Sequence, residues 1–239
     1  MRNLVRILTA LVCSMYLSFL PAQTDVTSVR EKLNTQFNKT KDFSVDVQLS
    51  LKMTAIRMPQ KKIRVFFKQP DHVKIETNGF AMVPQYGLPL SPETLFRAVS
   101  DMILVTEPAP EDGTVRLMGD LQIRDEDRQI WNFSRKQRRA LSIEVTVNTR
   151  LWVIKGYEIF RGEDKLIHVQ TRYTEPENGI YLPEETVILI KVPEELSDYQ
   201  PDFPFEEGIS PQDGKVTLTF KNYRLNQGLD ESLFLEGPE

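Results

Sequence analysis

The sequence predicts a mainly β protein, in which one long antiparallel sheet curls on itself and carries helices in its hollow. Runs of alternating apolar and polar residues recur along the chain, and turn signals separate them every eight to twelve residues. These runs add up to about ten or eleven strands. Two segments instead show the three- and four-residue apolar spacing of an amphipathic helix. A sheet of so many strands tends to curl, which produces the hollow.

The first 22 residues have the layout of a secretory signal peptide. Arg2 and Arg6 form a basic start, residues 7–20 are mostly apolar, and the segment ends at Pro21-Ala22. An uncleaved N-terminal anchor is the alternative interpretation. We therefore expect residues 1–22 to be a signal peptide and residues 23–239 to form a single exported domain. Because the only cysteine, Cys13, lies in the leader, that domain has no disulfide.

Charge and length narrow the function classes further. Without Arg2 and Arg6 the chain has 28 basic and 34 acidic residues, so its net charge is −6. A nucleic-acid-binding protein normally has a basic face, so we expect no nucleic-acid partner. The remaining chain is long enough to bury a core of useful size as one domain.

An amphipathic helix is predicted from Asp25 to Asn38, with Thr24 or Asp25 as its N-cap. Its apolar residues recur at spacings of three and four, which places them on one stripe. They are Val26, Val29, Leu33 and Phe37.

The clearest strand signal runs from residue 43 to residue 53, where apolar and polar residues alternate strictly. Two shorter strands follow and are joined by a turn at residues 69–71. Together the three predict an antiparallel meander with one continuous apolar face, although a one-residue slip would turn the other parity inward. The apolar residues of this face are Phe43, Val45, Val47, Leu49, Leu51, Met53, Ile63, Val65, Phe67, Val73 and Ile75.

A second helix is predicted inside the segment from Gly79 to Gly113, which is expected to leave the sheet and return to it. Ser91 is the expected cap, and Pro92 is expected at the first helical position. The apolar side of this helix is predicted to consist of Leu95, Phe96, Val99, Met102 and Ile103.

The rest of the chain reads as a further series of strands. Residues 115–120, 121–124 and 130–133 are predicted as three short strands, and alternation resumes at Ile143, Val145 and Val147. Strands at 151–160, 166–173, 181–192 and 216–220 follow, with turns between them. The segment from Pro193 to Asp213 has seven acidic residues and no Lys or Arg, so a solvated loop is expected.

Candidate catalytic and metal-binding residues are few. His72 lies next to a turn, and His168 lies on the polar parity of a strand between Ile167 and Val169. Neither has a nucleophile motif or a metal-ligand spacing beside it, and Asp125-Glu126-Asp127 lacks the glycine and distal glutamate of a calcium loop. We expect no enzyme activity, no metal and no cofactor.

Four features in order resemble the LolA/LolB family of bacterial lipoprotein carriers, the outer membrane lipoprotein-sorting type. The signal peptide leads through a short helix into the strand at 43–53, and an aromatic hairpin follows at residues 66–74. The run Gly179-Ile180-Tyr181-Leu182-Pro183 resembles the family's entry to a late strand. The end, from Phe220 through Leu229-Asp230 to Phe234, resembles its closing segment. Together these features span nearly the whole exported domain.

The resemblance implies an open antiparallel half-barrel in the periplasm, with helices covering a concave face that receives acyl chains. Gln69 is the candidate lid latch, because it stands where well-studied carriers have an arginine that is tied to latching the lid. Its hydrogen bonds are uncharged and therefore weaker than those of arginine. The predicted cavity residues are Val45, Val47, Leu49, Leu51, Val65, Phe67, Val73, Ile75, Leu95, Phe96, Val99, Met102, Val145 and Ile167.

Two functions remain open at this point. The first is a monomeric carrier that encloses the acyl chains of a lipoprotein or other amphiphile and meets a protein partner at the inner or outer membrane. The second is a non-catalytic regulatory module on the same scaffold, resembling the periplasmic stress regulator RseB, that uses an outer face or the acidic segment. In the plainest interpretation, the same apolar residues form only a core under the helices.

Overall fold

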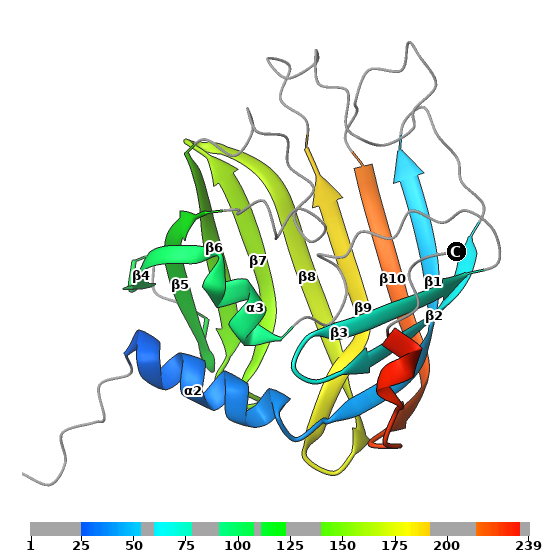
Figure 1. The fold of residues 1–239 in the computed structure, drawn as a ribbon. Coiled ribbons are helices and arrows are strands. Elements are labelled where there is room, and N and C mark those ends of the chain that lie inside the picture. Colours follow the sequence, from blue (N-terminus) through cyan, green and yellow to red (C-terminus); the bar gives the residue numbers. More distant parts are fainter. Residues whose placement is uncertain are drawn as a thin grey trace, which may run out of the picture.

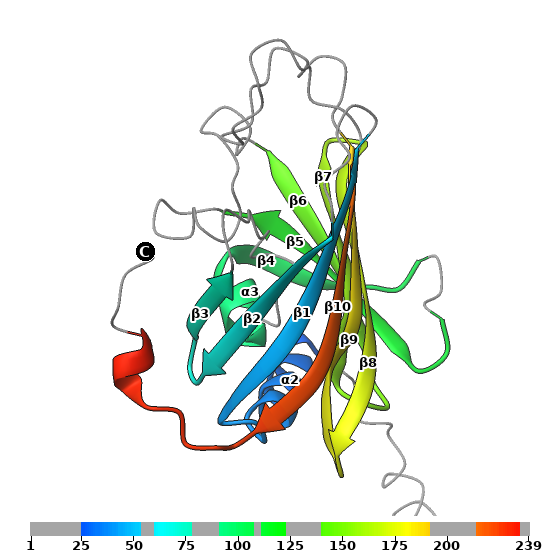
Figure 2. The same cartoon turned by 90° about the vertical axis from the view of Figure 1, so that its right-hand side faces the viewer.

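The fold is one open antiparallel sheet of ten strands, seen in a computed structural model that describes residues 25–53, 60–77, 91–107, 111–122, 140–191 and 214–234. The strand order is β3-β2-β1-β10-β9-β8-β7-β6-β5-β4, so β3 and β4 are the two edges. The sheet is strongly curved, and both α-helices lie on its concave side (Figure 1, Figure 2). The predicted fold class is therefore confirmed.

Consecutive strands are neighbours in the sheet except β3 and β4, which lie at opposite edges, and β10 joins the two halves because it lies between β9 and β1. The strands are β1 (Asp42–Met53), β2 (Lys61–Lys68), β3 (His72–Thr77), β4 (Val99–Val105), β5 (Thr114–Leu121), β6 (Leu141–Asn148), β7 (Val153–Arg161), β8 (Asp164–Glu177), β9 (Ile180–Ile190) and β10 (Gly214–Leu225). The helices within the described ranges are α2 (Val26–Phe37), α3 (Pro92–Arg97) and the 3₁₀ helix η5 (Glu231–Phe234).

The first predicted helix forms as α2. The Asp25 carboxylate accepts a hydrogen bond from the Ser28 amide at 2.6 Å, which satisfies one free donor of the first turn. The side chains of Val29 and Leu33 are buried on the concave side of the sheet. α2 packs against strands β4, β7 and β9 and against α3, so it lies across one end of the hollow (Figure 1).

The predicted meander of β1, β2 and β3 has the expected register. Val65 lies opposite both Val45 and Ile75, and Phe67 lies opposite Phe43. Residues that are directly opposite share one face of a sheet, so the predicted apolar parity of all three strands is continuous. This confirms the choice of parity against the one-residue slip.

The second predicted helix is much shorter than expected, and this part of the prediction was wrong. α3 ends at Arg97, and Val99 and Met102 belong to the edge strand β4. A bulge between Ser100 and Ile103, with a positive φ of 50° at Asp101, adds a residue to the strand. The extra residue puts Val99 and Met102 on one face at a spacing of three, which mimics a helix.

The same bulge turns Ile103 outward, where its side chain is 60% exposed instead of lying on an apolar helix face. β4 approaches β5 so closely that a Cβ on Gly119 would lie 2.6 Å from both the Ser100 carbonyl oxygen and Val99 Cγ1. Only glycine fits at such a close approach. The chain therefore returns to the sheet at Val99, well before the predicted return at Gly113.

The strand predicted at residues 115–120 continues to Leu121 as β5, and Gln122 lies outside it, so the separate strand predicted from Leu121 does not begin there. Several other predictions lie outside the described residues. They concern the signal peptide, Asp125-Glu126-Asp127, the strand at 130–133 and the acidic segment from Pro193 to Asp213.

Candidate functional site: the concave face

The concave face is built from apolar rows that run across the sheet from strand to strand. One row crosses seven strands and consists of Leu117, Val145, Tyr157, Val169, Ile188, Val216 and Leu51, each directly opposite the next. Direct opposition places them all on one face. A single buried cluster joins this face to Val29 and Leu33 of α2 and to Leu95 and Phe96 of α3. The concave face and the two helices therefore share one core.

The predicted cavity residues fall into two groups by burial. All of the strand members lie on the concave face, and Leu95 and Phe96 lie on α3. Buried members are Val45, Val47, Leu49, Val65, Phe67, Leu95, Phe96, Val145 and Ile167. Half-buried members are Leu51, Val73, Ile75, Val99 and Met102. The structure brings all fourteen to one side of the sheet.

Aromatic residues fill the end of the concave face where α2 meets β1. The Phe37 ring at the end of α2 lies edge-on to Phe67, with ring centroids 5.4 Å apart. Phe67 in turn stacks on Phe43 at 5.0 Å, and Phe43 contacts Tyr223 at 5.6 Å. Phe43 and Phe67 are fully buried. Such ring pairs stabilise a packed core, so this aromatic end is a closed plug.

Two tyrosine hydroxyls are buried within the same end. Tyr173 donates to the Ile154 carbonyl at 2.8 Å, and Tyr223 donates to the Pro183 carbonyl at 2.7 Å. Burial raises the pKa of both phenols well above the ordinary value, and for Tyr223 the nearby Tyr173 adds to the effect. Both phenols therefore stay neutral and act as hydrogen-bond donors.

The opposite end of the concave face is aliphatic. Its rows lie near the last residues of β1 and β9 and the first residues of β8 and β10. The side chains there lack hydrogen-bonding groups, so they present a surface suited to hydrocarbon. They include Leu49, Leu51, Ile63, Ile143, Ile159, Ile167, Ile188, Ile190 and Val216.

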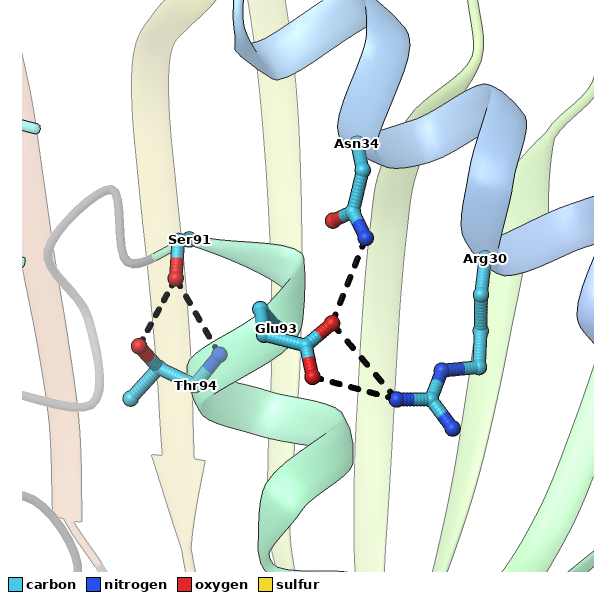
Figure 3. Close-up of polar contacts among 5 residues, drawn as sticks. All are labelled: Arg30, Asn34, Ser91, Glu93 and Thr94. Carbon is cyan, nitrogen blue, oxygen red and sulfur yellow. Dashed lines mark hydrogen bonds and ion pairs between the residues drawn. The ribbon is translucent and has the colours of Figure 1, made fainter. Parts of the chain in front are cut away.

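α3 is joined to α2 by polar contacts of one carboxylate (Figure 3). Arg30 Nη2 donates to Glu93 Oε1 at 3.2 Å, and Asn34 Nδ2 donates to Glu93 Oε2 at 3.2 Å. The Arg30 guanidinium also lies 5.5 Å from the Phe96 ring centroid. Because Glu93 sits in the first turn of α3, its charge also suits the positive end of the helix dipole. These residues form a clamp between the two helices.

The start of α3 is held by Ser91. Its hydroxyl accepts a hydrogen bond from the Thr94 amide at 3.1 Å and lies 2.7 Å from the Thr94 hydroxyl (Figure 3). Ser91 and Thr94 are both buried, so these bonds satisfy polar groups that water does not reach. The predicted cap is confirmed.

Gln69 binds near the end of α2. Its Nε2 donates to the Thr40 carbonyl at 2.8 Å and to Asn38 Oδ1 at 3.2 Å, and its backbone amide donates to the Lys41 carbonyl. These contacts tie the β2–β3 turn to the connection between α2 and β1. The gating role predicted for Gln69 stays a prediction.

α2 has further polar contacts to the sheet. Lys32 Nζ lies 4.4 Å from the Trp152 ring centroid at the start of β7, which is a cation–π contact. Gln36 Nε2 and Lys39 Nζ both donate to the Gly179 carbonyl, at 2.8 and 3.1 Å. α2 is therefore fixed to two strand turns.

Sequence reasoning missed the clamp of Arg30, Asn34 and Glu93. Arg30 and Asn34 lie one helical turn apart, which shows that they share a face, but Glu93 is 59 or more residues away in the chain. No local pattern pairs groups so distant. Only the acidic first turn of α3 was visible in the sequence.

Both histidines lie where the sequence placed them. His168 is on the convex side and pairs with Glu158 at 2.6 Å, and the exposed His72 lies 5.8 Å from the Phe234 ring centroid. Within the described ranges, no group of three or more His, Cys, Asp or Glu side chains could hold a metal ion. Among the helices in those ranges, none is long and apolar enough to cross a membrane.

An open, curved antiparallel sheet with helices in its hollow and an apolar concave face defines the class of half-barrel folds. Solved structures of the LolA type share this architecture. A LolA superfamily protein from Nitrosomonas europaea matches with a TM-score of 0.53 and 12% identity, over 88% of this chain and 97% of that one. The chain therefore has a LolA-like fold.

Two further structures agree. A domain described as an outer membrane lipoprotein-sorting protein, from Vibrio parahaemolyticus, matches at a TM-score of 0.52 and 8% identity, covering 86% of this chain and 95% of that one. A DUF1329 family protein from Desulfovibrio piger matches at 0.51 and 10% identity, covering 88% and 98%. No family model matches the sequence, and no curated protein matches it significantly.

Proposed function

We propose that this protein is an exported, periplasmic carrier that binds the acyl chains of a lipoprotein or other amphiphile on the aliphatic end of its concave face. The observation that carries the proposal is the unbroken apolar concave face of a single open sheet, with aliphatic side chains at one end and an aromatic plug at the other. The LolA-like fold supports it, because one neighbour is described as lipoprotein-sorting.

The driving force for binding is burial of hydrocarbon. Each methylene that leaves water contributes roughly 0.8 kcal/mol, so one acyl chain of ordinary length outweighs the cost of moving a short helix. The plug excludes ligand from the α2 end, so the acyl chains occupy the rows near Leu51, Ile188 and Val216. α3 is the cover that moves, because it is short and joined to α2 by a clamp at the surface.

Leu51→Trp tests the site directly. Leu51 is half-buried on the aliphatic end, so a tryptophan there takes the volume that an acyl chain needs. The same substitution at Ile103, which is 60% exposed and faces outward, is the matched control. Each protein is purified without detergent, challenged with a diacylated lipopeptide and measured by native mass spectrometry.

The wild type and Ile103→Trp are expected to carry one lipopeptide, and Leu51→Trp is expected to remain free of ligand at an unchanged melting temperature. A ligand-free mass for the wild type after the challenge would contradict the proposal. The regulatory alternative would use an outer face or the acidic segment from Pro193 to Asp213, and that segment lies outside the described residues.

A further inference from the structure

The convex side of β3, β2, β1 and β10 carries a strong excess of positive charge. Its outward-facing bases are Lys52, Lys62, Arg64, Lys68, Lys74, Lys215, Lys221 and Arg224, and its acids are Asp42, Asp46 and Glu76. Asp42 is buried and accepts hydrogen bonds from the amides of Gln227 and Gly228. This excess stands out in a chain whose net charge is −4.

The other half of the convex side is different, because its charges are paired. Arg172 binds both Glu184 and Glu185, at 2.8 and 3.3 Å. Lys165 binds Glu158 at 2.7 Å. If these charges served only to keep the surface soluble, both halves of the convex side would have a similar mixture of bases and acids. The concentration of bases on one half therefore needs another explanation.

Several of the bases have no acidic neighbour. Lys52 on β1 lies directly opposite Lys215 on β10, and like charges in that arrangement destabilise a sheet. Within the part of the chain that the structure describes, no ion pair forms at Lys52, Lys62 or Lys215. Lys221 and Arg224 share the single carboxylate of Asp46 with Arg64. Repulsion between Lys52 and Lys215 destabilises the sheet locally, so these two lysines are not there to stabilise the fold.

A groove of about 770 Å³ lies in the middle of these bases. Its polar lining includes three bases, two amide side chains and two carboxylates. They are Lys62, Arg64, Lys221, Gln48, Asn222, Asp46 and Glu76. Asp46 in the groove forms an ion pair with Arg64 Nη2 at 2.9 Å and accepts a hydrogen bond from Asn222 Nδ2 at 3.0 Å. The bases and amide donors outnumber the two carboxylates of the groove, and such donors suit a phosphate group.

We propose that this face docks on an anionic bilayer and takes a phosphate-bearing lipid headgroup into the groove. The basic face comprises Lys52, Lys62, Arg64, Lys215, Lys221 and Arg224. Lysines near an anionic leaflet contribute on the order of fivefold in binding each, and the attraction fades within a Debye length. Because the whole chain is negative, this local charge also orients the molecule at the surface.

The basic face extends to the aliphatic end of the sheet, where the proposed acyl site lies. The Lys52–Lys215 pair is one residue from the Leu51–Val216 pair of the aliphatic end. A bilayer bound at these lysines lies beside the rim of the proposed acyl site. Docking itself does not depend on acyl binding, so it can be tested separately.

The test compares two variants with the same change in net charge. One replaces Lys52, Lys62, Lys215 and Lys221 by Gln, and the control replaces Arg150, Lys155, Lys165 and Arg172 by Gln. Binding is measured by co-sedimentation with vesicles of phosphatidylglycerol mixed with phosphatidylcholine, with vesicles of phosphatidylcholine alone, and at low and high salt. Circular dichroism and melting temperature confirm that both variants are folded.

The wild type and the control are expected to bind the anionic vesicles at low salt, with weaker binding at high salt and none to neutral vesicles. The basic-face variant is expected to bind at least about tenfold more weakly. Equal loss in both variants, or none in either, overturns the proposal. If the wild type ignores anionic vesicles but binds polyglutamate in a salt-dependent way, the face serves an acidic polypeptide and the bilayer proposal fails. Binding to neutral vesicles would report acyl insertion instead of docking.

Discussion

α2 and α3 lie side by side on the concave face, but the rest of the chain holds them very differently (Figure 1, Figure 3). α2 has 12 residues, a capped start, two buried side chains, and polar contacts to two strand turns. α3 has 6 residues and packs only on α2 and on the edge strand β4 among the described elements with several contacts. Both helices contribute to the core, but α2 is anchored to the sheet at more points than α3.

The difference teaches which element can move at low cost. A helix of six residues is far too short to be stable by itself, so α3 exists only through its contacts. Breaking those contacts exposes Leu95 and Phe96, whereas moving α2 would also break the aromatic plug. Local openings draw on the least stable parts of a structure. We therefore assign opening of the concave face to α3.

Leu33→Ala in α2 is expected to have the largest effect. Leu33 is 1% exposed, and truncating a buried leucine to alanine costs about 2–5 kcal/mol through lost burial and the cavity left behind. Thr35→Ala on the exposed side of the same helix is the control and is expected to change stability by less than about 0.5 kcal/mol. Urea unfolding measures both. Similar midpoints for the two variants would show that α2 is not part of the core.

The second-largest effect is expected at alkaline pH, where the aromatic plug contributes less to the free energy of unfolding. Burial raises the pKa of Tyr173 and Tyr223 in the folded state, so their contribution is complete below about pH 10 and is lost as the pH rises further. Each tyrosine lowers the free energy of unfolding by up to about 1.4 kcal/mol per pH unit there.

Urea unfolding at a series of alkaline pH values measures this slope. Replacing both tyrosines by Phe is expected to flatten it, while Tyr181→Phe is expected to keep the wild-type slope. If the double variant loses stability with pH as steeply as the wild type does, other groups cause the alkaline loss.

The contrast between α2 and α3 also explains which elements could be predicted from the sequence. α2 was predicted almost to the residue because its cap and its apolar spacing are local. The parity of β1, β2 and β3 was predictable for the same reason, since alternation is a period of two. α3 was predicted too long because the bulge at Asp101 gives β4 the spacing of a helix.

The candidate site was predictable in its apolar part only. Alternation groups the apolar side chains of a strand on one face, and those cavity residues lie on the concave face. Val99 and Met102 also lie there, although they were predicted on a helix. The clamp at Glu93 and the basic face depend on residues that the topology brings together from distant segments. Lys52 and Lys215 lie directly opposite each other although 162 residues separate them in the chain. A single sequence holds no local record of such pairs.

Removing the N-cap of each helix separates the roles of α2 and α3, with an expected effect of about 1 kcal/mol. Loss of a Ser or Asp cap costs about 0.5–2 kcal/mol of helix stability. Asp25→Ala is expected to lower the global free energy of unfolding, because α2 unfolds only with the core. Ser91→Ala is expected to speed hydrogen exchange in α3 more than elsewhere. Hydrogen-exchange mass spectrometry on both variants tests these two expectations. If Ser91→Ala lowers the protection of backbone amides uniformly along the chain, α3 does not open separately from the core.

Glu93→Gln is expected to have the smallest effect on stability and to test the clamp itself. The Arg30–Glu93 pair is exposed, with side chains 40% and 58% accessible, so its loss costs less than about 1 kcal/mol. Removing the charge nevertheless frees the cover from α2, so uptake of a fluorescent acyl probe is expected to become faster in stopped-flow measurements. Glu31→Gln removes an equal charge from the exposed side of α2 and is expected to keep the wild-type rate of probe uptake. If Arg30→Gln and Glu93→Gln together speed uptake by the product of their single effects, the two residues act independently and no clamp exists. A smaller combined effect means that they share one interaction, as the geometry of the pair predicts.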